Sequence, residues 1–405
     1  MDHYDIVIFG GGIVGLSVAY GLKDIGLRVV IIESVLPRPD IDKDILFPNA
    51  KRFSALNQAS KLLFQYFGIW NHILNTNTSA FYRVEAWERD SFGYINFDEG
   101  LTKNHLRPLG YVIENQEVHG LLWQHVSNLN HMTIVIRKKI TGVSVTDKEA
   151  LISFTNGTMI STSLIVAADG THSWLRQHAK IPALFWDYRH HALIANIRTE
   201  IPHKDAAYQV FHANSVLAFL PLKDPYLSAI VWSLPPEKAE YLMNASERVF
   251  NQKLSVSFDV RLGLCNVVGS RQVFPLQGCY AQKLISNRLV LVGNSAHTIH
   301  PLAGQGLNIG LMDAAELIGE VRRLQHQGKD IGKYQYLRRY ERQRRYNTHK
   351  ILLSTEGCYR IFMGDHLGKK ILRDSLLRMV NQLPGIKSYL LEHAQGMTHI
   401  PNWLR

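Results

Sequence analysis

Three glycine-containing motifs lie far apart in the chain, and each follows a short apolar segment. They read GGGIVG at residues 10–15, ADGTHS at 168–173 and GNSAHTIHPLAGQG at 293–306. Glycines after a strand let a backbone approach a ligand closely, and the free N–H groups of a following helix attract an anion. The residue types and their spacing therefore indicate a site for a phosphate-containing cofactor.

The first motif has the spacing of a dinucleotide turn. Gly10 allows the tight turn, Gly12 lets a pyrophosphate approach the backbone, and Gly15 lets the helix pack on the strand. Residues 13–14, Ile13 and Val14, begin that helix and join the predicted site. Glu33 ends the next strand, where an acid hydrogen-bonds a ribose hydroxyl. A purely structural turn would not explain why strand, turn, helix, strand and acid follow in this order.

The second and third motifs extend the site along the chain. Asp169 alone would indicate an ordinary Asp-Gly turn, but beside the other motifs it favours a role in the cofactor domain. Asn294 can offer its amide oxygen to a ribityl hydroxyl, and the small residues of 301–306 let backbone N–H groups approach a flat ring. The three motifs in this order indicate FAD held along its length, in contrast to a transiently bound NAD. The helix from Leu307 adds positive potential, which would stabilise the negative charge of the reduced flavin. We predict catalytic roles for Pro301, Gly304 and Gln305, and cofactor contacts for Gly293, Asn294, Gly304, Gly306, Leu307 and Asn308.

Histidines and cysteines are weaker candidates. His297 and His300 lie beside the third motif, where they can be acid–base groups or structural histidines bonded to backbone, and we favour the structural interpretation. The three cysteines form no Cys-x-x-Cys pair, and no cluster of ligand residues has metal-binding spacing, so we expect no metal site.

The positive charge is concentrated in the last part of the chain. The formal net charge is +11, and residues 320–405 hold 17 Lys and Arg against 7 Asp and Glu, a net of +10. The densest run, 338–345, suits anionic lipid, an acidic partner or a solvated helix face; nucleic acid is disfavoured because no binding module accompanies it. We see no signal peptide and no stretch of the about 18 apolar residues that span a bilayer. We therefore expect a cytoplasmic protein, with peripheral contact at the inner face of the membrane as an option.

Hydrophobic periodicity predicts an α/β fold interrupted by a strand-rich insertion. We expect strands at 5–9, 29–32, 192–198, 208–212, 216–220, 227–233 and 289–292, a hairpin at 82–98, helices at 14–23, 54–67, 118–128 and 236–254, and helical structure after residue 306. We divide the 405 residues into a Rossmann-like domain (1–70, 105–182 and 276–320), a β-rich substrate domain (71–104 and 183–275) and a C-terminal helical region (321–405).

With these residues placed, the chain resembles the FAD-dependent aromatic hydroxylases, the group that includes p-hydroxybenzoate hydroxylase. Within that group it is most similar to the hydroxylases of ubiquinone biosynthesis, and closest to the bacterial enzymes that act at C5 of a 2-polyprenylphenol. The segments that carry the resemblance are RFSAL at 52–56, EN at 114–115, LWQ at 122–124, FWDY at 185–188, LAFLPL at 217–222, MDAAEL at 312–317, GKDIG at 328–332, YLRRYER at 336–342 and WLR at 403–405.

The resemblance implies both a reaction and a set of partners. FAD, reduced by NAD(P)H or a partner protein, would capture O2 as a C4a-hydroperoxide and transfer oxygen to a phenol ring. Arg52 and Gln124 would join the FAD contacts. The substrate would be a lipophilic polyprenylphenol, other ubiquinone-biosynthesis proteins would be partners, and we expect a homo-oligomer that binds no nucleic acid. A hydroxylase acting at C6, or a flavin-binding scaffold with weak catalysis, stays open.

Two points qualify the resemblance. Most of the family has Asp and Ala where this chain has Asn294 and Ser295, and the branch that acts at C6 can also carry Asn. An apolar channel for the tail should lie in the β-rich insertion. We name four residues as its wall, although plain core packing is the alternative that we favour for each: Phe211, Leu217, Phe219 and Trp232.

Overall fold

A parallel sheet forms the base of the cofactor-binding half. The computed structural model describes the chain except residues 35–50, 90–92, 99–106, 137–139, 301–303, 363 and 365–366. Its first sheet has the order β18-β11-β1-β2-β8, with β17 at the edge. The strands are β1 (Asp2–Phe9), β2 (Val29–Glu33), β8 (Met132–Ile136), β11 (Met159–Ala167), β17 (Ile285–Ser286) and β18 (Leu289–Leu291), and β9 (Ile140–Val145) and β10 (Ala150–Phe154) extend the sheet beside β11.

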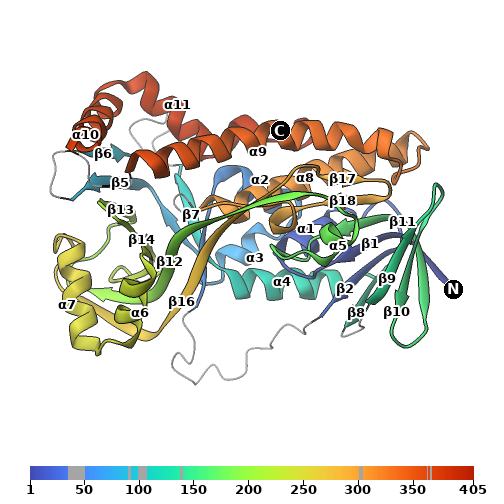
Figure 1. Cartoon of the computed structure of the whole chain (residues 1–405), viewed down its shortest axis with the longest axis horizontal. Helices are drawn as coiled ribbons and strands as arrows, with labels where there is room; N and C mark the ends of the chain where they lie inside the picture. Colours follow the sequence, from blue (N-terminus) through green and yellow to red (C-terminus); the bar gives the residue numbers. More distant parts are fainter. Residues whose placement is uncertain are drawn as a thin grey trace.

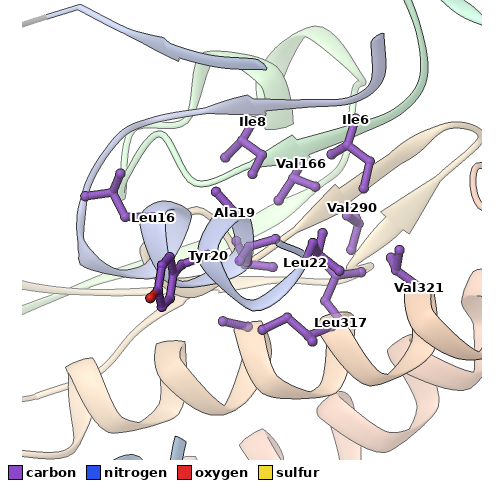
Figure 2. Close-up of a cluster of buried hydrophobic side chains, with 14 of the residues drawn as sticks. Ile6, Ile8, Leu16, Ala19, Tyr20, Leu22, Val166, Val290, Leu317 and Val321 are labelled. Atoms are coloured by element: carbon purple, nitrogen blue, oxygen red, sulfur yellow. The ribbon is translucent and has the colours of Figure 1, made fainter. Parts of the chain in front are cut away.

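Helices cover the first sheet because its strands are apolar on both faces. Helix α1 (Ile13–Gly21) starts directly after the glycine turn and contacts α4 (Asn115–Ser127) and α8 (Gln305–His326). Figure 2 shows Ala19 and Leu22 between the strands and Leu317 of α8. This packing brings the beginning of α8, more than 280 residues away in sequence, next to the glycine turn. A short helix, α5 (Trp174–His178), follows the second motif.

The second sheet is mainly antiparallel and has the order β19-β16-β12-β15-β14-β13-β5-β6. Its strands are β5 (Arg83–Glu88), β6 (Tyr94–Phe97), β12 (Ala183–Thr199), β13 (Ala206–His212), β14 (Ser215–Pro221), β15 (Leu227–Leu234), β16 (Cys265–Ala281) and β19 (His297–Thr298). The 17-residue strands β12 and β16 run side by side from the first sheet to the second (Figure 1). The predicted strands and the two arms of the predicted hairpin are confirmed, and the hairpin's tip lies outside the described residues.

Two of the predicted helices are corrected. The helix expected at 236–254 is two helices, α6 (Pro236–Asn244) and α7 (Glu247–Ser257), because the side chain of Ser246 caps α7 by accepting from the N–H of Val249. The helix expected at 54–67 begins only at α2 (Gln58–Tyr66), after a cap by Asn57. The residues before that cap instead form strand β3 (Phe53–Leu56), which pairs with β7 (Gly110–Glu114) beside β4 (Ser79–Phe81) and helix α3 (Trp70–Leu74).

The end of the chain is helical, as predicted. Its helices are α9 (Tyr334–Phe362), α10 (Leu367–Gln382) and α11 (Pro384–Ala394). A buried ion pair between Arg373 and Glu88, with 2.5 Å between Nη2 and Oε1, joins α10 to the end of β5. Among the described residues, no helix combines the length and the apolar composition that crossing a membrane requires. The division into three domains stays a prediction.

The basic run on α9 is not a single surface. Arg338, Arg339 and Arg342 are exposed, but Arg344 is buried and its Nε lies 2.6 Å from Oδ1 of Asp313 in α8. Arg344 falls on the buried stripe of α9 together with Leu337, Tyr340, Asn347 and Thr348. Interpreting all of 338–345 as one charged face is therefore wrong, because the helical period turns part of it inward.

Candidate cofactor and substrate site

One cavity of about 670 Å³ lies between the glycine turn and the second sheet. Both β3 and α11 contribute to its wall, so segments from the whole chain meet there. The sequence-predicted residues that line it are Gly12, Ile13, Val14, Gly15, Arg52, Asn294, Gly304, Gln305, Gly306, Leu307 and Asn308. The structure brings these positions together, and their roles toward a ligand stay a prediction.

The surroundings of the glycines in the first motif differ from one position to the next. Gly10 has a φ of +102°, and a Cβ there would overlap the carbonyl of Ala168. A Cβ on Gly15 would overlap the carbonyl oxygen of Gly10, where the helix meets the strand. Gly12 differs, because its Cβ would meet no protein atom within 4 Å and its φ of −71° suits any residue. The fold therefore requires glycine at positions 10 and 15, whereas a side chain at position 12 would enter open space.

Glu33 holds the glycine turn from the end of β2. Its Oε2 accepts a hydrogen bond from the N–H of Gly11 at 2.5 Å, and its Oε1 accepts from the N–H of Ser34 at 2.6 Å. The carboxylate is not part of the cavity wall. His119 of α4 contacts the same turn, with 2.7 Å between Nε2 and the carbonyl oxygen of Gly11, a contact that the sequence did not suggest.

We expect the change Glu33→Ala to weaken FAD binding while the protein still folds. The carboxylate is predicted to hydrogen-bond a ribose hydroxyl and also fixes the turn, so its loss should cost about 1–3 kcal/mol, the range for a hydrogen bond to a charged group. Fluorescence titration of apoprotein with FAD measures this change. His119→Ala is the matched control for loss of the turn contact alone, and equal FAD affinity in wild type and Glu33→Ala would contradict the assignment.

A buried charged network supports the third motif. Asp313 of α8 accepts from the N–H of Gly293 at 2.8 Å, lies 2.7 Å from Nε2 of His297, and pairs with Arg344. Burial alone would raise the pKa of Asp313, but the charges and hydrogen bonds of His297 and Arg344 outweigh it, so the pKa is lowered. The network fixes the backbone at Gly293 while Asn294 remains exposed on the cavity wall.

Asn308 ties α8 to the segment after β3. Its Oδ1 accepts from the N–H of Asn57 at 2.9 Å and from Oγ of Ser60 at 2.8 Å, and its Nδ2 donates to the carbonyl of Ala55 at 2.8 Å. Although Asn308 lines the cavity, these protein contacts occupy its amide. The Asn308 side chain therefore holds the cavity wall together through protein contacts, whereas the sequence predicted only a contact with the cofactor.

Arg52 and the residues at the beginning of α8 both line the cavity. Gly304 caps α8 with a φ of +61°, and Nε2 of Gln305 donates to the carbonyl of Ala394 at 3.3 Å. Pro301, also predicted as catalytic, lies outside the described residues. Arg52 is accessible from the cavity, whose walls displace bulk water and lower its pKa, and its guanidinium lies 5.8 Å from the ring centre of Phe274.

Five other predicted residues do not line the cavity. Gly10, Glu33 and Gly293 support the backbone that does. Asp169 accepts from the N–H of Leu175 at 3.2 Å through Oδ2, while its Oδ1 is buried with no hydrogen-bond partner in the described part of the chain. Gln124 is exposed on α4.

The β-rich insertion lines the cavity, but the four residues named as the channel wall do not, and strand phase explains three of them. Leu217, Phe219 and Trp232 face the opposite side of the second sheet, where they pack with Phe250 and the rest of the core under α6 and α7. Phe211 is on the cavity-facing side but stacks on Phe362, with 4.0 Å between ring centres. For Leu217, Phe219 and Trp232 the alternative interpretation as core is confirmed, because successive residues of a strand point to opposite faces.

His297 and His300 both make structural contacts, as predicted, but each contacts a side chain, whereas the sequence suggested the backbone. His297 bonds Asp313, and Nε2 of His300 lies 3.3 Å from Oγ of Ser233. The rings of Tyr188 and Tyr359 lie 4.8 Å and 4.9 Å from His300. Burial and, less strongly, the charge of His190 lower the pKa of His300 to about 3, so it is neutral at pH 7.

We expect His300 to make the fold sensitive to mild acid. The unfolded chain takes up a proton below a pKa of about 6.5, whereas folded His300 stays neutral until about 3, so stability is lost as pH falls through this window. Between pH 7 and pH 5 the loss from this residue should be about 2 kcal/mol. Urea denaturation at both pH values gives the free energy of unfolding, which should change less with pH in His300→Phe than in wild type. The same change in both proteins would refute the role of His300.

The described groups fit FAD. Gly12 leaves open space beside a helix N-terminus, Asp169 has a buried unpaired oxygen, and the cavity has the size of a cofactor site. Within the described ranges no three His, Cys, Asp or Glu side chains gather to hold a metal ion. Solved structures of the same fold confirm the predicted fold class, and the family model and the hydroxylase relatives define the class as FAD-dependent aromatic monooxygenases.

The family model described as an FAD binding domain matches residues 3–354, and the chain belongs to that family. FAD is therefore its cofactor. Two curated relatives match along almost their whole length. The 3-demethoxyubiquinol 3-hydroxylase of Escherichia coli is 29% identical over 396 residues, 97% of this chain and 98% of the relative. The human mitochondrial ubiquinone biosynthesis monooxygenase COQ6 is 28% identical over 438 residues, 96% of this chain and 92% of the relative.

Solved structures agree with the fold. The p-nitrophenol 4-monooxygenase PnpA of Pseudomonas putida superposes with a TM-score of 0.77 at 16% identity and covers 99% of both chains. The Klebsiella pneumoniae protein HpxO, solved with FAD and uric acid, has a TM-score of 0.73 at 18% identity and covers 98% of this chain and 97% of its own.

Proposed function

We propose that this chain hydroxylates the aromatic ring of a polyprenylphenol in ubiquinone biosynthesis, with O2 as the oxygen source and C5 as the position. C6 is the alternative position. The curated relatives support the pathway, because both carry a ubiquinone-pathway activity in their names. The observation that carries the proposal is one continuous cavity whose two ends have different chemistry.

The first end of the cavity suits a dinucleotide and the second suits an isoprenoid tail. Gly12, Asn294 and the beginning of α8 supply small residues, an amide and N–H groups. The side toward the second sheet is lined by Phe81, Val84, Leu109, Leu220 and Leu391. Burying alkyl groups against such a wall is favourable by about 25 cal/mol per Å² of apolar surface.

The residues of this chain have separate proposed roles around the bound cofactor. FAD supplies the chemistry that activates O2, and NAD(P)H is the proposed electron donor. Gly304 and Gln305 would contact the reacting ring, and the positive end of α8 would attract negative charge there; Pro301 has the same proposed role but lies outside the described residues. The apolar wall excludes water from the reaction. In this proposal residues 1–70, 105–182 and 276–320 hold the cofactor, and the protein acts as a homo-oligomer with other ubiquinone-biosynthesis proteins.

The test is complementation followed by mass spectrometry. The gene is expressed in bacterial strains that lack either the C5- or the C6-hydroxylation step, under isotope-labelled O2. Restored ubiquinone with label in the C5 strain supports the proposal, and rescue of the C6 strain alone supports the alternative position. A flavin-bound protein that rescues neither strain and incorporates no label would exclude both and leave a scaffold role.

We also propose that the protein works in the cytoplasm and contacts the inner face of the membrane peripherally. The exposed Arg338, Arg339 and Arg342 on α9 should attract an anionic bilayer by up to about 1 kcal/mol for each residue near the surface. Changing all three to Gln should reduce co-sedimentation with vesicles containing phosphatidylserine. Binding of the wild type should also fall as salt rises, because salt screens exposed charges.

The matched control changes three other exposed basic residues to Gln. Lys238, Arg248 and Lys253 lie on α6 and α7, away from α9 (Figure 1). The two triple variants have the same net charge, so a difference between them reports where the charge lies. Equal vesicle binding by both triple variants would refute a docking role for α9.

A further inference from the structure

The second sheet presents a nearly apolar face to the cavity. Along one cross-strand row, Gln209 of β13 pairs with Ala218 of β14 and with Ala86 of β5. The row continues from Ala218 through Val231 of β15 to Ile194 of β12. Gln209, Ala218, Val231 and Ile194 all line the cavity. Gln209 therefore stands among alanine and aliphatic side chains.

Gln209 is unusual among the polar residues of this face. Of the described residues of the second sheet that line the cavity, only Tyr208, Thr298 and Gln209 carry polar side-chain atoms. The hydroxyl of Tyr208 donates to the carbonyl of His203 at 3.1 Å, and Oγ1 of Thr298 lies 3.0 Å from Oγ1 of Thr171. Among the described residues, none is hydrogen-bonded to the side chain of Gln209, which is half-buried and lines the cavity.

An unpaired amide in an apolar wall needs a hydrogen-bond partner from the cavity. A glutamine amide has two N–H donors and an oxygen acceptor, and leaving them unpaired after water is displaced costs about 1–3 kcal/mol. An isoprenoid tail has no group that can pair with the amide. A hydroxyl or methoxy oxygen on an aromatic ring can pair, and the cross-strand neighbours of Gln209, Ala86 and Ala218, have only methyl side chains.

We propose that Gln209 is a specificity-determining residue whose amide hydrogen-bonds an oxygen substituent of the substrate ring. This inference rests on the proposed function and deepens it, because it separates recognition of the ring from burial of the tail. Gln209 selects rings that carry an oxygen at this position and fixes their orientation. The aliphatic residues of the row make apolar contacts that do not distinguish one ring from another.

The test compares two probes that differ by one hydroxyl group, 2-hexylphenol and hexylbenzene. Calorimetric titration of the FAD-loaded wild type should give about tenfold tighter binding of the phenol, the ratio that 1.4 kcal/mol produces. Gln209→Met keeps the side-chain length but removes the donors and the acceptor, so the two dissociation constants should become nearly equal. The loss should come from weaker binding of the phenol, with hexylbenzene unchanged.

The control is Gln272→Met, because Gln272 of β16 pairs with Ile194 in the same cross-strand row but does not line the cavity. This variant should keep the tenfold preference. The inference would be overturned if Gln209→Met kept the preference for 2-hexylphenol, or if it lost affinity equally for both probes. A wild type that binds both probes equally would overturn it too. Failure of the proposed function would be recognised separately: the wild type would bind FAD but would incorporate no labelled oxygen into a product.

Discussion

Replacing Gly12 with valine is expected to abolish FAD binding and leave the fold intact. A Cβ at Gly12 meets no protein atom within 4 Å and the backbone φ of −71° accepts it, so the apoprotein has no reason to lose stability. The added methyl groups would occupy the space that the pyrophosphate needs. FAD affinity should fall by at least about 100-fold, equivalent to about 2.7 kcal/mol. Flavin absorbance after purification and a titration with FAD measure this loss.

The control for Gly12→Val is Gly15→Ala, which should show the reverse order of effects. A Cβ on Gly15 would overlap the carbonyl of Gly10, so this variant should lose thermal stability even without ligand. Apoprotein melting curves distinguish the two. Full flavin occupancy in Gly12→Val, or a melting temperature lowered as much as in Gly15→Ala, would show that Gly12 serves the fold and not the cofactor.

Asp313→Ala should be strongly destabilising, by about 3–5 kcal/mol, because it leaves Arg344 buried without its counter-charge. It also removes the acceptor for the N–H of Gly293, so the backbone beside Asn294 should loosen. Urea denaturation measures the cost. The double variant Asp313→Ala with Arg344→Met should recover part of it, because no unpaired charge remains. A cost below 1 kcal/mol, or strictly additive effects, would argue against a coupled network.

The same network predicts an acid dependence with a defined sign. The pKa of Asp313 is lowered in the folded protein, so its ion pair contributes stability above the unfolded-state pKa of about 4. That contribution disappears as pH falls from there through the folded-state pKa. Wild type should therefore lose stability below about pH 4, and Asp313→Asn should lack this part of the loss. The His300 contribution continues down to about pH 3 and therefore overlaps this window, so the Asp313 part is the difference in pH dependence between wild type and Asp313→Asn below pH 4.

The parts of the site that sequence predicted are those governed by local geometry. The first glycine motif specifies strand, turn and helix within a short segment, and residues 10–15 adopt that arrangement. The third motif similarly leads into α8 at Gly304. That the third motif lies beside the first could be predicted only from the order of the motifs, because no local sequence signal links segments almost 300 residues apart.

The parts that sequence missed depend on tertiary contacts. Ser54 has helix-compatible neighbours, but pairing with Ile113 of β7 makes it a strand residue. The tail-binding wall was assigned to large residues such as Phe219, whereas the cavity-facing positions are the smaller residues between them, such as Ala218. Arg344 could have been recognised, because it lies seven residues after Leu337 on the same helix face.

The paired strands β12 and β16 act mechanically as a ribbon between the two sheets. Their ladder runs from Ala183 and Ala281 to Thr199 and Cys265, with irregularities between Asp187 and His191 and between Ile194 and Asn196. A continuous hydrogen-bonded ladder resists stretching, whereas irregular pairing is where strands bend. The sheets can therefore tilt relative to each other more easily than they can separate. Because Ile194, at the second irregularity, lines the cavity, we expect a bend of the ribbon there to change the width of the cavity.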